Sequence, residues 1–198
     1  MQLLSYISQV FASVQDVYDY LAANIPWWDS TANNKLTKEN ITIEVSSNAL
    51  LITETNGGQT ITTANFISNA TEYIGITDDA VIIGIKISGG SYYDGVVISK
   101  STDGTNTHWG AIEKRNGGTA YQKILTYGAL AADTGTLNAP VESSYNMQII
   151  PAYASQTRYK INNTFMAIMS PSPLYNGKLT LNNKNFVQCG GLVLQYTE

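Results

Sequence analysis

The first twenty-five residues carry apolar side chains at helical spacing. Successive apolar positions are separated by alternating steps of four and three, which is the a/d pattern of a coiled-coil heptad. Branched side chains at both positions favour three or more helices over two. The pattern therefore predicts an N-terminal α-helix over residues 1–25 that oligomerises as a homotrimer. The predicted seam consists of Leu3, Ile7, Val10, Val14, Val17 and Leu21.

A second apolar row widens the stripe of this predicted helix. Leu4, Phe11 and Tyr18 occupy the e positions, so the helix has more to bury than a two-helix seam covers. We expect these side chains to contact a second surface, either the β-domain of the same chain or a partner. The alternative to a coiled coil is that the whole amphipathic helix packs on the β-domain of its own chain.

A proline ends the predicted helix, and two tryptophans follow it. Pro26 cannot continue a helix and disfavours the α conformation of the preceding residue, which places the helix end near Asn24. Because exposed indoles are costly, we expect Trp27 and Trp28 either to plug the junction with the β-domain or to dock on a partner. Residues 26–40 are predicted to be a linker, since 29–40 are polar.

From residue 41 the pattern changes to short segments rich in Ile, Val, Thr and Tyr, separated by turns that contain Gly and Asn. This pattern is typical of antiparallel β-structure. The fold class is therefore mostly β, with residues 41–198 predicted to form a jelly-roll-like antiparallel β-sandwich behind the α-helix. Ala80–Ile87 is apolar nearly throughout, so we expect both of its faces to be buried. The predicted strands are 41–46, 48–54, 59–63, 80–87, 92–100, 108–115, 119–128, 146–153, 157–162, 164–169, 178–182 and 186–196.

One hairpin is predicted directly from its turn. Asn116-Gly117-Gly118 supplies the positive φ angles that a tight turn needs, and it joins 108–115 to 119–128.

Charge and cysteine content exclude several classes of function. Only 13% of the residues are charged and the net charge is −4, which argues against binding nucleic acid. The sequence shows neither a secretory signal nor an apolar run of membrane-spanning length, so we expect a chain that folds in a cytoplasm without membrane insertion. The single cysteine, Cys189, cannot form an intrachain disulfide and is expected to be buried in a C-terminal strand.

The sequence contains no recognisable catalytic or metal-binding motif. One histidine, His108, and one cysteine cannot supply the usual zinc ligands, and no phosphate-binding loop is present. We therefore predict no cofactor, no metal and no enzyme activity. A glycosidase would need only two carboxylates, but we expect the acids on the strands to face solvent because they occupy alternating positions. These acids are Glu44, Glu54, Glu72, Asp94, Glu113 and Glu142.

Aromatic residues provide the alternative function. The chain has 13 tyrosines and 3 tryptophans, and aromatic faces beside polar side chains are what carbohydrate recognition uses. An exposed cluster would make the chain a carbohydrate- or receptor-binding module; otherwise these residues fill the core. The candidate glycan-binding residues are Tyr92, Tyr93, Asp94, Trp109 and Tyr121.

The layout of helix, Trp/Pro junction and Gly/Asn/Thr/Tyr-rich β-domain resembles bacteriophage virion structural proteins, such as tail or head fibres, baseplate components and capsid decoration proteins. The resemblance implies a virion location, contacts with other virion proteins and a role in attachment to the host, for which a cell-surface glycan is a candidate partner. It rests on no motif, so it transfers no site residue. In such proteins the N-terminal helix attaches or trimerises the subunit and the β-domain is displayed.

Overall fold

Antiparallel strands form most of the regular structure of this protein. The computed structural model describes residues 1–86, 93–102, 106–115, 121–126, 129–133, 142–144, 147–154, 159–169 and 176–198. The helix in these residues is α1 (Val14–Asn24). The strands are β1 Leu3–Phe11, β2 Lys35–Lys38, β3 Ile41–Ser46, β4 Ala49–Glu54, β5 Gln59–Thr62, β6 Ala70–Thr77, β7 Ala80–Lys86, β8 Tyr93–Thr102, β9 Thr107–Arg115, β10 Tyr121–Thr126, β11 Ala129–Asp133, β12 Glu142–Ser144, β13 Met147–Ala154, β14 Tyr159–Met169, β15 Gly177–Leu181, β16 Lys184–Cys189 and β17 Leu192–Tyr196.

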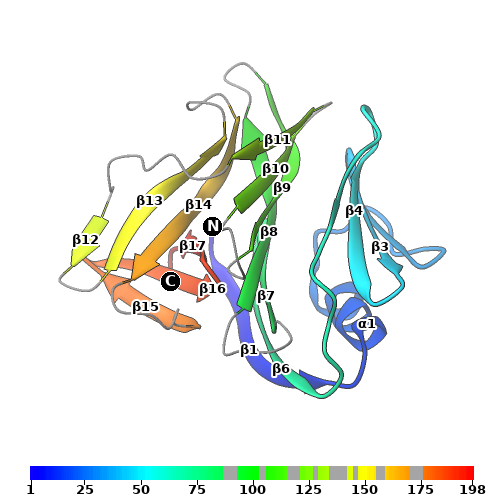
Figure 1. The fold of residues 1–198 in the computed structure, drawn as a ribbon, viewed down its shortest axis with the longest axis horizontal. Coiled ribbons are helices and arrows are strands. Elements are labelled where there is room, and N and C mark those ends of the chain that lie inside the picture. Colours follow the sequence, from blue (N-terminus) through cyan, green and yellow to red (C-terminus); the bar gives the residue numbers. More distant parts are fainter. Residues whose placement is uncertain are drawn as a thin grey trace.

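The strands lie in three layers (Figure 1). The first layer is the sheet β2-β3-β4-β5 together with α1, and the central layer runs from β1 through β6, β7, β8, β9 and β10 to β11. The third layer contains β13, β14, β17, β16 and β15. The central and third layers belong to one hydrogen-bonded sheet, because Ser101 of β8 pairs with Ile161 of β14. An isolated parallel bridge also joins Gln2 to Thr197.

The central layer is buried on both faces. On β7, Val81, Ile83 and Ile85 enter the core that is shared with the first layer. Ala80 and Ile82 enter the core that is shared with the third layer. The prediction that this apolar run lies at the centre with both faces covered is confirmed for residues 80–86.

Glycines allow the third layer to approach the backbone of the central layer. Gly84 and Gly95 stand directly opposite each other on β7 and β8. A Cβ atom on Gly95 would lie 2.5 Å from the carbonyl oxygen of Cys189. Gly190, at φ +59°, lies in the β16–β17 turn, which packs against Gly95. A Cβ atom added to Gly190 would lie 2.6 Å from the Gly95 nitrogen. The backbones of the central and third layers are therefore in direct contact at this point, with no side chain between them.

Much of the predicted β-pattern is confirmed. The chain is mostly β with antiparallel sheets, and β3 has the predicted bounds. The predicted hairpin is formed by β9 and β10, with Ile112 opposite Ile124, although its turn lies outside the described residues. The strand predicted over 186–196 is instead divided into β16 and β17 at Gly190 and Gly191. The finer jelly-roll arrangement stays a prediction.

The N-terminal helix is shorter than predicted. Residues 3–11 form β1, whose Ile7 lies opposite Ile74 of β6, and the helix begins only after Ser13. The Ser13 hydroxyl accepts a hydrogen bond from the Asp16 backbone N–H at 3.2 Å, and the Asp16 carboxylate accepts one from the Ser13 N–H at 3.0 Å. This capping box fixes the start of the helix. Its end at Asn24 is as predicted.

The predicted linker over residues 26–40 is also partly a strand. Lys35–Lys38 forms β2, which pairs with β3, and the backbone N–H of Thr37 donates to the Ser30 carbonyl at 2.8 Å. The polar side chains of this segment lie on an edge strand, where water can reach them. Over the residues that the structure describes, no helix is long and apolar enough to cross a membrane.

Candidate functional site

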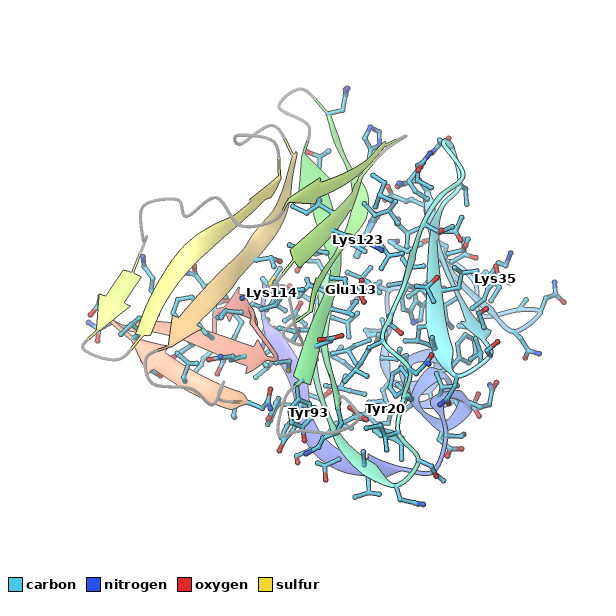
Figure 2. All side chains as sticks on the ribbon, viewed as in Figure 1. Tyr20, Lys35, Tyr93, Glu113, Lys114 and Lys123 are labelled. Carbon is cyan, nitrogen blue, oxygen red and sulfur yellow. The ribbon has the colours of Figure 1, made fainter. Side chains whose placement is uncertain are left out.

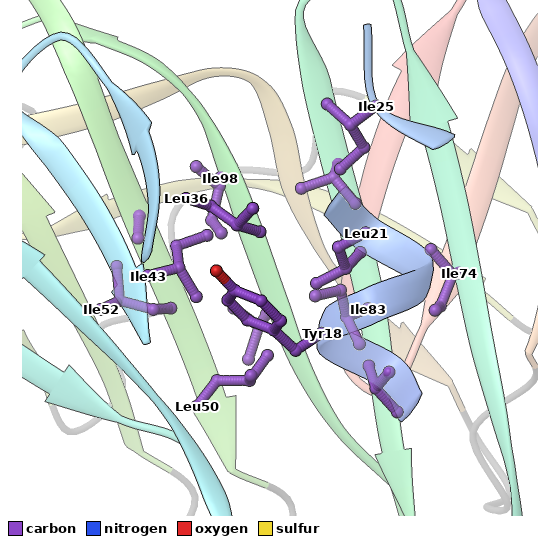
Figure 3. Close-up of a cluster of buried hydrophobic side chains, with 14 of the residues drawn as sticks. Tyr18, Leu21, Ile25, Leu36, Ile43, Leu50, Ile52, Ile74, Ile83 and Ile98 are labelled. Carbon is purple, nitrogen blue, oxygen red and sulfur yellow. The ribbon is translucent and has the colours of Figure 1, made fainter. Parts of the chain in front are cut away.

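The predicted coiled-coil seam is divided between two elements. Leu3, Ile7 and Val10 lie on β1, while Val14, Val17 and Leu21 lie on α1. The three helical residues are buried in the core between the first and central layers, where Leu21 packs near Ile74 and Ile83 (Figure 3). The expected continuous helical seam is wrong, because pairing with β6 makes its first half a strand and the core of the same chain covers its second half.

The second apolar row meets the same core. Phe11 and Tyr18 are buried there, and the Phe11 ring packs edge-on against Tyr20 with centroids 5.9 Å apart. Burial raises the pKa of the Tyr18 hydroxyl, which has no hydrogen-bond partner. Of the three predicted contact residues, Leu4 alone stays exposed, at 47%. The surface that Phe11 and Tyr18 contact is therefore the β-domain of their own chain.

The tryptophan pair joins the first layer to the central layer. Trp27 stacks on Trp109 of β9 with ring centroids 4.6 Å apart, and Trp28 lies 4.4 Å from Trp27. The Trp27 indole N–H donates to the Thr77 carbonyl at 3.0 Å, and that of Trp28 donates to the Leu21 carbonyl at 3.1 Å. Both indoles thus make their polar contacts within the chain.

The side chain of Asn40 links the first and central layers. The sequence pattern did not identify this residue. Its side-chain amide donates to the Trp109 carbonyl at 2.9 Å and accepts from the Trp109 N–H at 3.1 Å. The side chain thus makes the pair of hydrogen bonds that the backbone of a neighbouring strand would make. It also donates to the Glu54 carboxylate at 3.3 Å. Asn40 precedes β3 at the end of a polar segment, so nothing local distinguishes it from an ordinary turn residue.

The proposed glycan-binding aromatics are not exposed where the structure describes them. Trp109 is 2% exposed, Tyr93 is 8% exposed and Asp94 is 1% exposed. Trp109 is covered by Trp27, and Tyr93 packs edge-on against Tyr73 while the Lys86 amine lies 5.2 Å from its ring centroid. Tyr92 and the side chain of Tyr121 lie outside the described residues. The three buried residues offer no face to a sugar, because layers on both sides cover them.

Several acids expected to face solvent are buried instead. Glu54, Glu72, Asp94 and Glu113 are all almost fully buried, because a layer covers the face on which alternation placed them. Glu54 accepts hydrogen bonds from the backbone N–H groups of Asn56 at 3.0 Å and Gly57 at 2.6 Å. Acids this deep are closed to a polymeric substrate. Within the described residues no three acidic, histidine or cysteine side chains gather closely enough to hold a metal ion.

Charged side chains also lie within the layers (Figure 2). Glu113 on β9 stands opposite Lys123 on β10, an arrangement in which opposite charges stabilise the strand pair. Lys114 points to the other face, toward the β16–β17 turn, and burial lowers the pKa of its amine. These groups serve the layered scaffold, and the candidate functional surface lies elsewhere.

That surface is the free edge of β1. Among the edges whose side chains are described, β2 carries Lys35 and Lys38, β15 carries Lys178, and β5 has only four residues. Lysines and short length both discourage pairing with another strand. β1 has nine residues and no charge, and it ends the order β1-β6-β7-β8. It is therefore the longest uncharged edge among these. Its start is bonded to the C-terminal segment, because the Leu3 N–H donates to the Thr197 carbonyl at 3.4 Å.

Exposed apolar side chains mark the same strand. Val10 is 55% exposed and Leu4 is 47% exposed; of the described side chains, Leu130 is the other large hydrophobic one at the surface. Leu4 is the extra residue at an irregularity in the β1–β6 register between Leu3 and Ser5. We call residues 4–10 of β1, with these two exposed side chains, the β1 edge surface.

No protein-family model, curated protein or solved structure matches this chain. The role of the β1 edge surface is therefore inferred from its own residues.

Proposed function

We propose that this chain is a non-enzymatic structural subunit, of the kind that builds bacteriophage virions, which associates through its N-terminal segment and displays its β-layers. The observation that supports this most directly is the uncharged β1 edge surface. A long edge strand without charge or proline is suited to strand addition. In this proposal association runs through a strand in place of the helical seam.

The β1 edge is held rigidly by the core behind it. Ile7 and Phe11 pack into the core between the first and central layers, and the Phe11 carbonyl accepts from the Asn69 backbone N–H at 2.9 Å. The capped helix α1 follows directly and is buried on one face. A strand that is already ordered loses little conformational entropy when a partner pairs with it, which favours binding.

The virion setting follows from the resemblance in layout to fibre, baseplate and decoration proteins. The partners would be further copies of this chain and neighbouring virion proteins. Capsid and tail genes beside the gene for this chain would support that setting, and a neighbourhood of unrelated metabolic genes would count against it. The alternative of a carbohydrate-binding module has no described exposed aromatic cluster to support it.

A charge on the edge tests the proposal. We expect the native chain to oligomerise at roughly 100 μM in size-exclusion chromatography with light scattering. Val10→Lys should shift it to the monomer with an unchanged circular dichroism spectrum, because a lysine on an edge strand opposes pairing. Ala23→Lys, on the exposed side of α1, is the matched control and should leave the oligomer intact. A native chain that stays monomeric would overturn the proposal, as would equal effects of the two lysines.

A further inference from the structure

We propose that the chain modifies itself at Asn56-Gly57, where the Glu54 carboxylate catalyses the loss of ammonia from Asn56 and converts it into an aspartyl or isoaspartyl residue. The site is the turn between β4 and β5 in the first layer. A side-chain amide that precedes glycine is open to attack by the next backbone nitrogen, because glycine has no side chain to hinder it. The site includes no residue of β1, so this inference is independent of the proposed function.

One carboxylate contacts both of the nitrogens that must react. The Gly57 backbone N–H, which has to attack, donates to Oε2 of Glu54 at 2.6 Å. The Asn56 side-chain amide, whose nitrogen has to leave, donates to Oε1 of Glu54 at 2.8 Å. A group that takes a proton from the nucleophile and supplies one to the leaving group must lie within hydrogen-bond distance of both. Glu54 meets this condition.

The carboxylate is held in place from the core side of the turn. Glu54 is 0% exposed, and the Asn40 side-chain amide donates to its Oε1 at 3.3 Å. Asn40 also fixes the turn, because its backbone carbonyl accepts from the Thr55 N–H at 2.8 Å. Asn56 and Gly57 are themselves exposed, so water reaches the amide and ammonia can leave. A fixed base beside an accessible amide is the arrangement in which positioning accelerates a reaction most.

The reaction requires only water as a second reactant. Glu54 takes the proton from the Gly57 nitrogen, which forms a bond to Cγ of Asn56. The bond from Cγ to Nδ2 then breaks, and the proton held by Glu54 leaves with the ammonia. This produces a cyclic succinimide and restores the carboxylate. Water opens the succinimide at Cγ to give aspartate, or at the backbone carbonyl carbon to give isoaspartate.

A second pair, Asn176-Gly177, provides a reference within the same chain. Its amide oxygen accepts from the Gly190 backbone N–H at 2.8 Å, which turns the side chain toward the β16–β17 turn. Among the described residues no carboxylate bonds to this pair. A third pair, Asn116-Gly117, lies outside the described residues. We therefore expect Asn176 to react no faster than an unassisted amide, whereas Asn56 reacts with the help of a base.

The modification weakens the link between the first and central layers. It removes the Asn56 amide donor and places a second carboxylate beside Glu54. Like charges this close repel each other. Glu54 in turn bonds to Asn40, whose side chain holds Trp109. Protein that has aged should therefore unfold at a lower urea concentration than fresh protein, and fresh Asn56→Asp should reproduce that lower midpoint.

Peptide mass spectrometry during long incubation measures the rate at each Asn-Gly pair. Asn56 should convert about tenfold faster in the folded chain than in guanidinium chloride, where Glu54 no longer faces it. Its rate in the folded chain should stay nearly constant between about pH 6 and about pH 8, because the base is a carboxylate. Attack that is assisted only by hydroxide would instead accelerate about tenfold per pH unit.

Removing the base provides the second readout. Glu54→Gln should slow the conversion of Asn56 about a hundredfold. Glu44→Gln makes the same change on the neighbouring strand β3, at an acid that pairs with Lys35, and as the matched control it should leave the rate unaltered. Circular dichroism establishes that both variants fold; if Glu54→Gln does not, the pH profile of the native chain decides.

Three results would overturn the proposal. The first is an Asn56 that converts no faster in the folded chain than in guanidinium chloride. The second is a rate in the folded chain that rises with hydroxide concentration across the whole pH range. The third is a folded Glu54→Gln variant that converts Asn56 at the native rate.

Discussion

Glu72 is a buried carboxyl group whose ionisation opposes folding at neutral pH. The side chain on β6 is 1% exposed, and one carboxylate oxygen accepts from the Lys86 backbone N–H at 2.8 Å. The other oxygen, Oε1, has no hydrogen-bond partner. Burial raises the pKa from 4.5 to about 7, although the hydrogen bond and the charge of Lys86 act in the opposite direction.

The size of the effect follows from this difference in pKa. Between pH 4.5 and about 7 the unfolded chain has an ionised Glu72 while the folded chain keeps it protonated. Unfolding then releases a proton, so the stability contributed by this group is fully present below pH 4.5 and is lost as the pH rises through the folded pKa. Each pH unit is worth about 1.4 kcal/mol, so the loss approaches about 3 kcal/mol above pH 7.

The substitution Glu72→Gln removes this titration and little else. The amide has the shape of the protonated acid, and its oxygen can still accept from the Lys86 N–H. We expect the variant to match the native chain near about pH 4 and to exceed it by about 3 kcal/mol near about pH 8. Urea unfolding followed by circular dichroism across this range measures the difference, in which the contributions of other groups cancel.

An exposed acid provides the control. Glu44 pairs with Lys35 at 2.8 Å on the surface, so Glu44→Gln should change stability by less than about 1 kcal/mol at any pH. A difference between Glu72→Gln and the native chain that does not vary with pH would refute the reasoning. So would a variant that is less stable than the native chain at the alkaline end.

Four other expectations concern packing. Asn40→Ala should cost about 3 kcal/mol in urea unfolding, because two buried backbone groups of Trp109 lose their partners. Leu21→Ala should cost about 3 kcal/mol equally at low and high protein concentration, whereas a coiled-coil role would make the loss concentration-dependent. Gly95→Ala should cost at least about 2 kcal/mol, because its Cβ meets a backbone oxygen at 2.5 Å; a stability equal to native would contradict this close approach. The Cys189 thiol, whose pKa is raised by complete burial, should react with a thiol reagent only after unfolding, and rapid native labelling would contradict its placement.

The N-terminal segment shows where a local pattern is ambiguous. Steps of four and three suit one face of a helix, and α1 does bury Val14, Val17 and Leu21 on one face. On β1 the same steps place Ile7 and Val10 on opposite faces of a strand, so Ile7 packs inward while Val10 is exposed. The hydrogen bonds that make residues 3–11 a strand come from β6, and the paired residues are about 60 to 75 positions apart in the sequence. A pattern read over one segment contains no information about that partner.

The candidate surface was predicted only in part. From apolar character and spacing, Val10 was assigned to the oligomerisation seam and Leu4 to a second contact surface. Both remain exposed, but the element that presents them is a strand at the edge of its sheet. Trp109 and Asp94 were candidates for sugar binding because aromatic faces beside polar side chains suit carbohydrate recognition. In this fold the first layer covers the face of the sheet on which they lie, so aromatic content alone could not indicate exposure.

By itself the sequence determined the local features: the β-rich pattern, the doubly buried run Ala80–Lys86, the helix end before Pro26 and the burial of Cys189. These depend on side-chain size, branching and backbone restriction, which act over a few residues. Tertiary structure alone decided that residues 3–11 are a strand, that a third layer covers the central sheet, and that β1 is left at an edge. Each of these depends on which distant segment supplies a hydrogen-bond partner or a covering face, and that choice is made by the free energy of the whole fold.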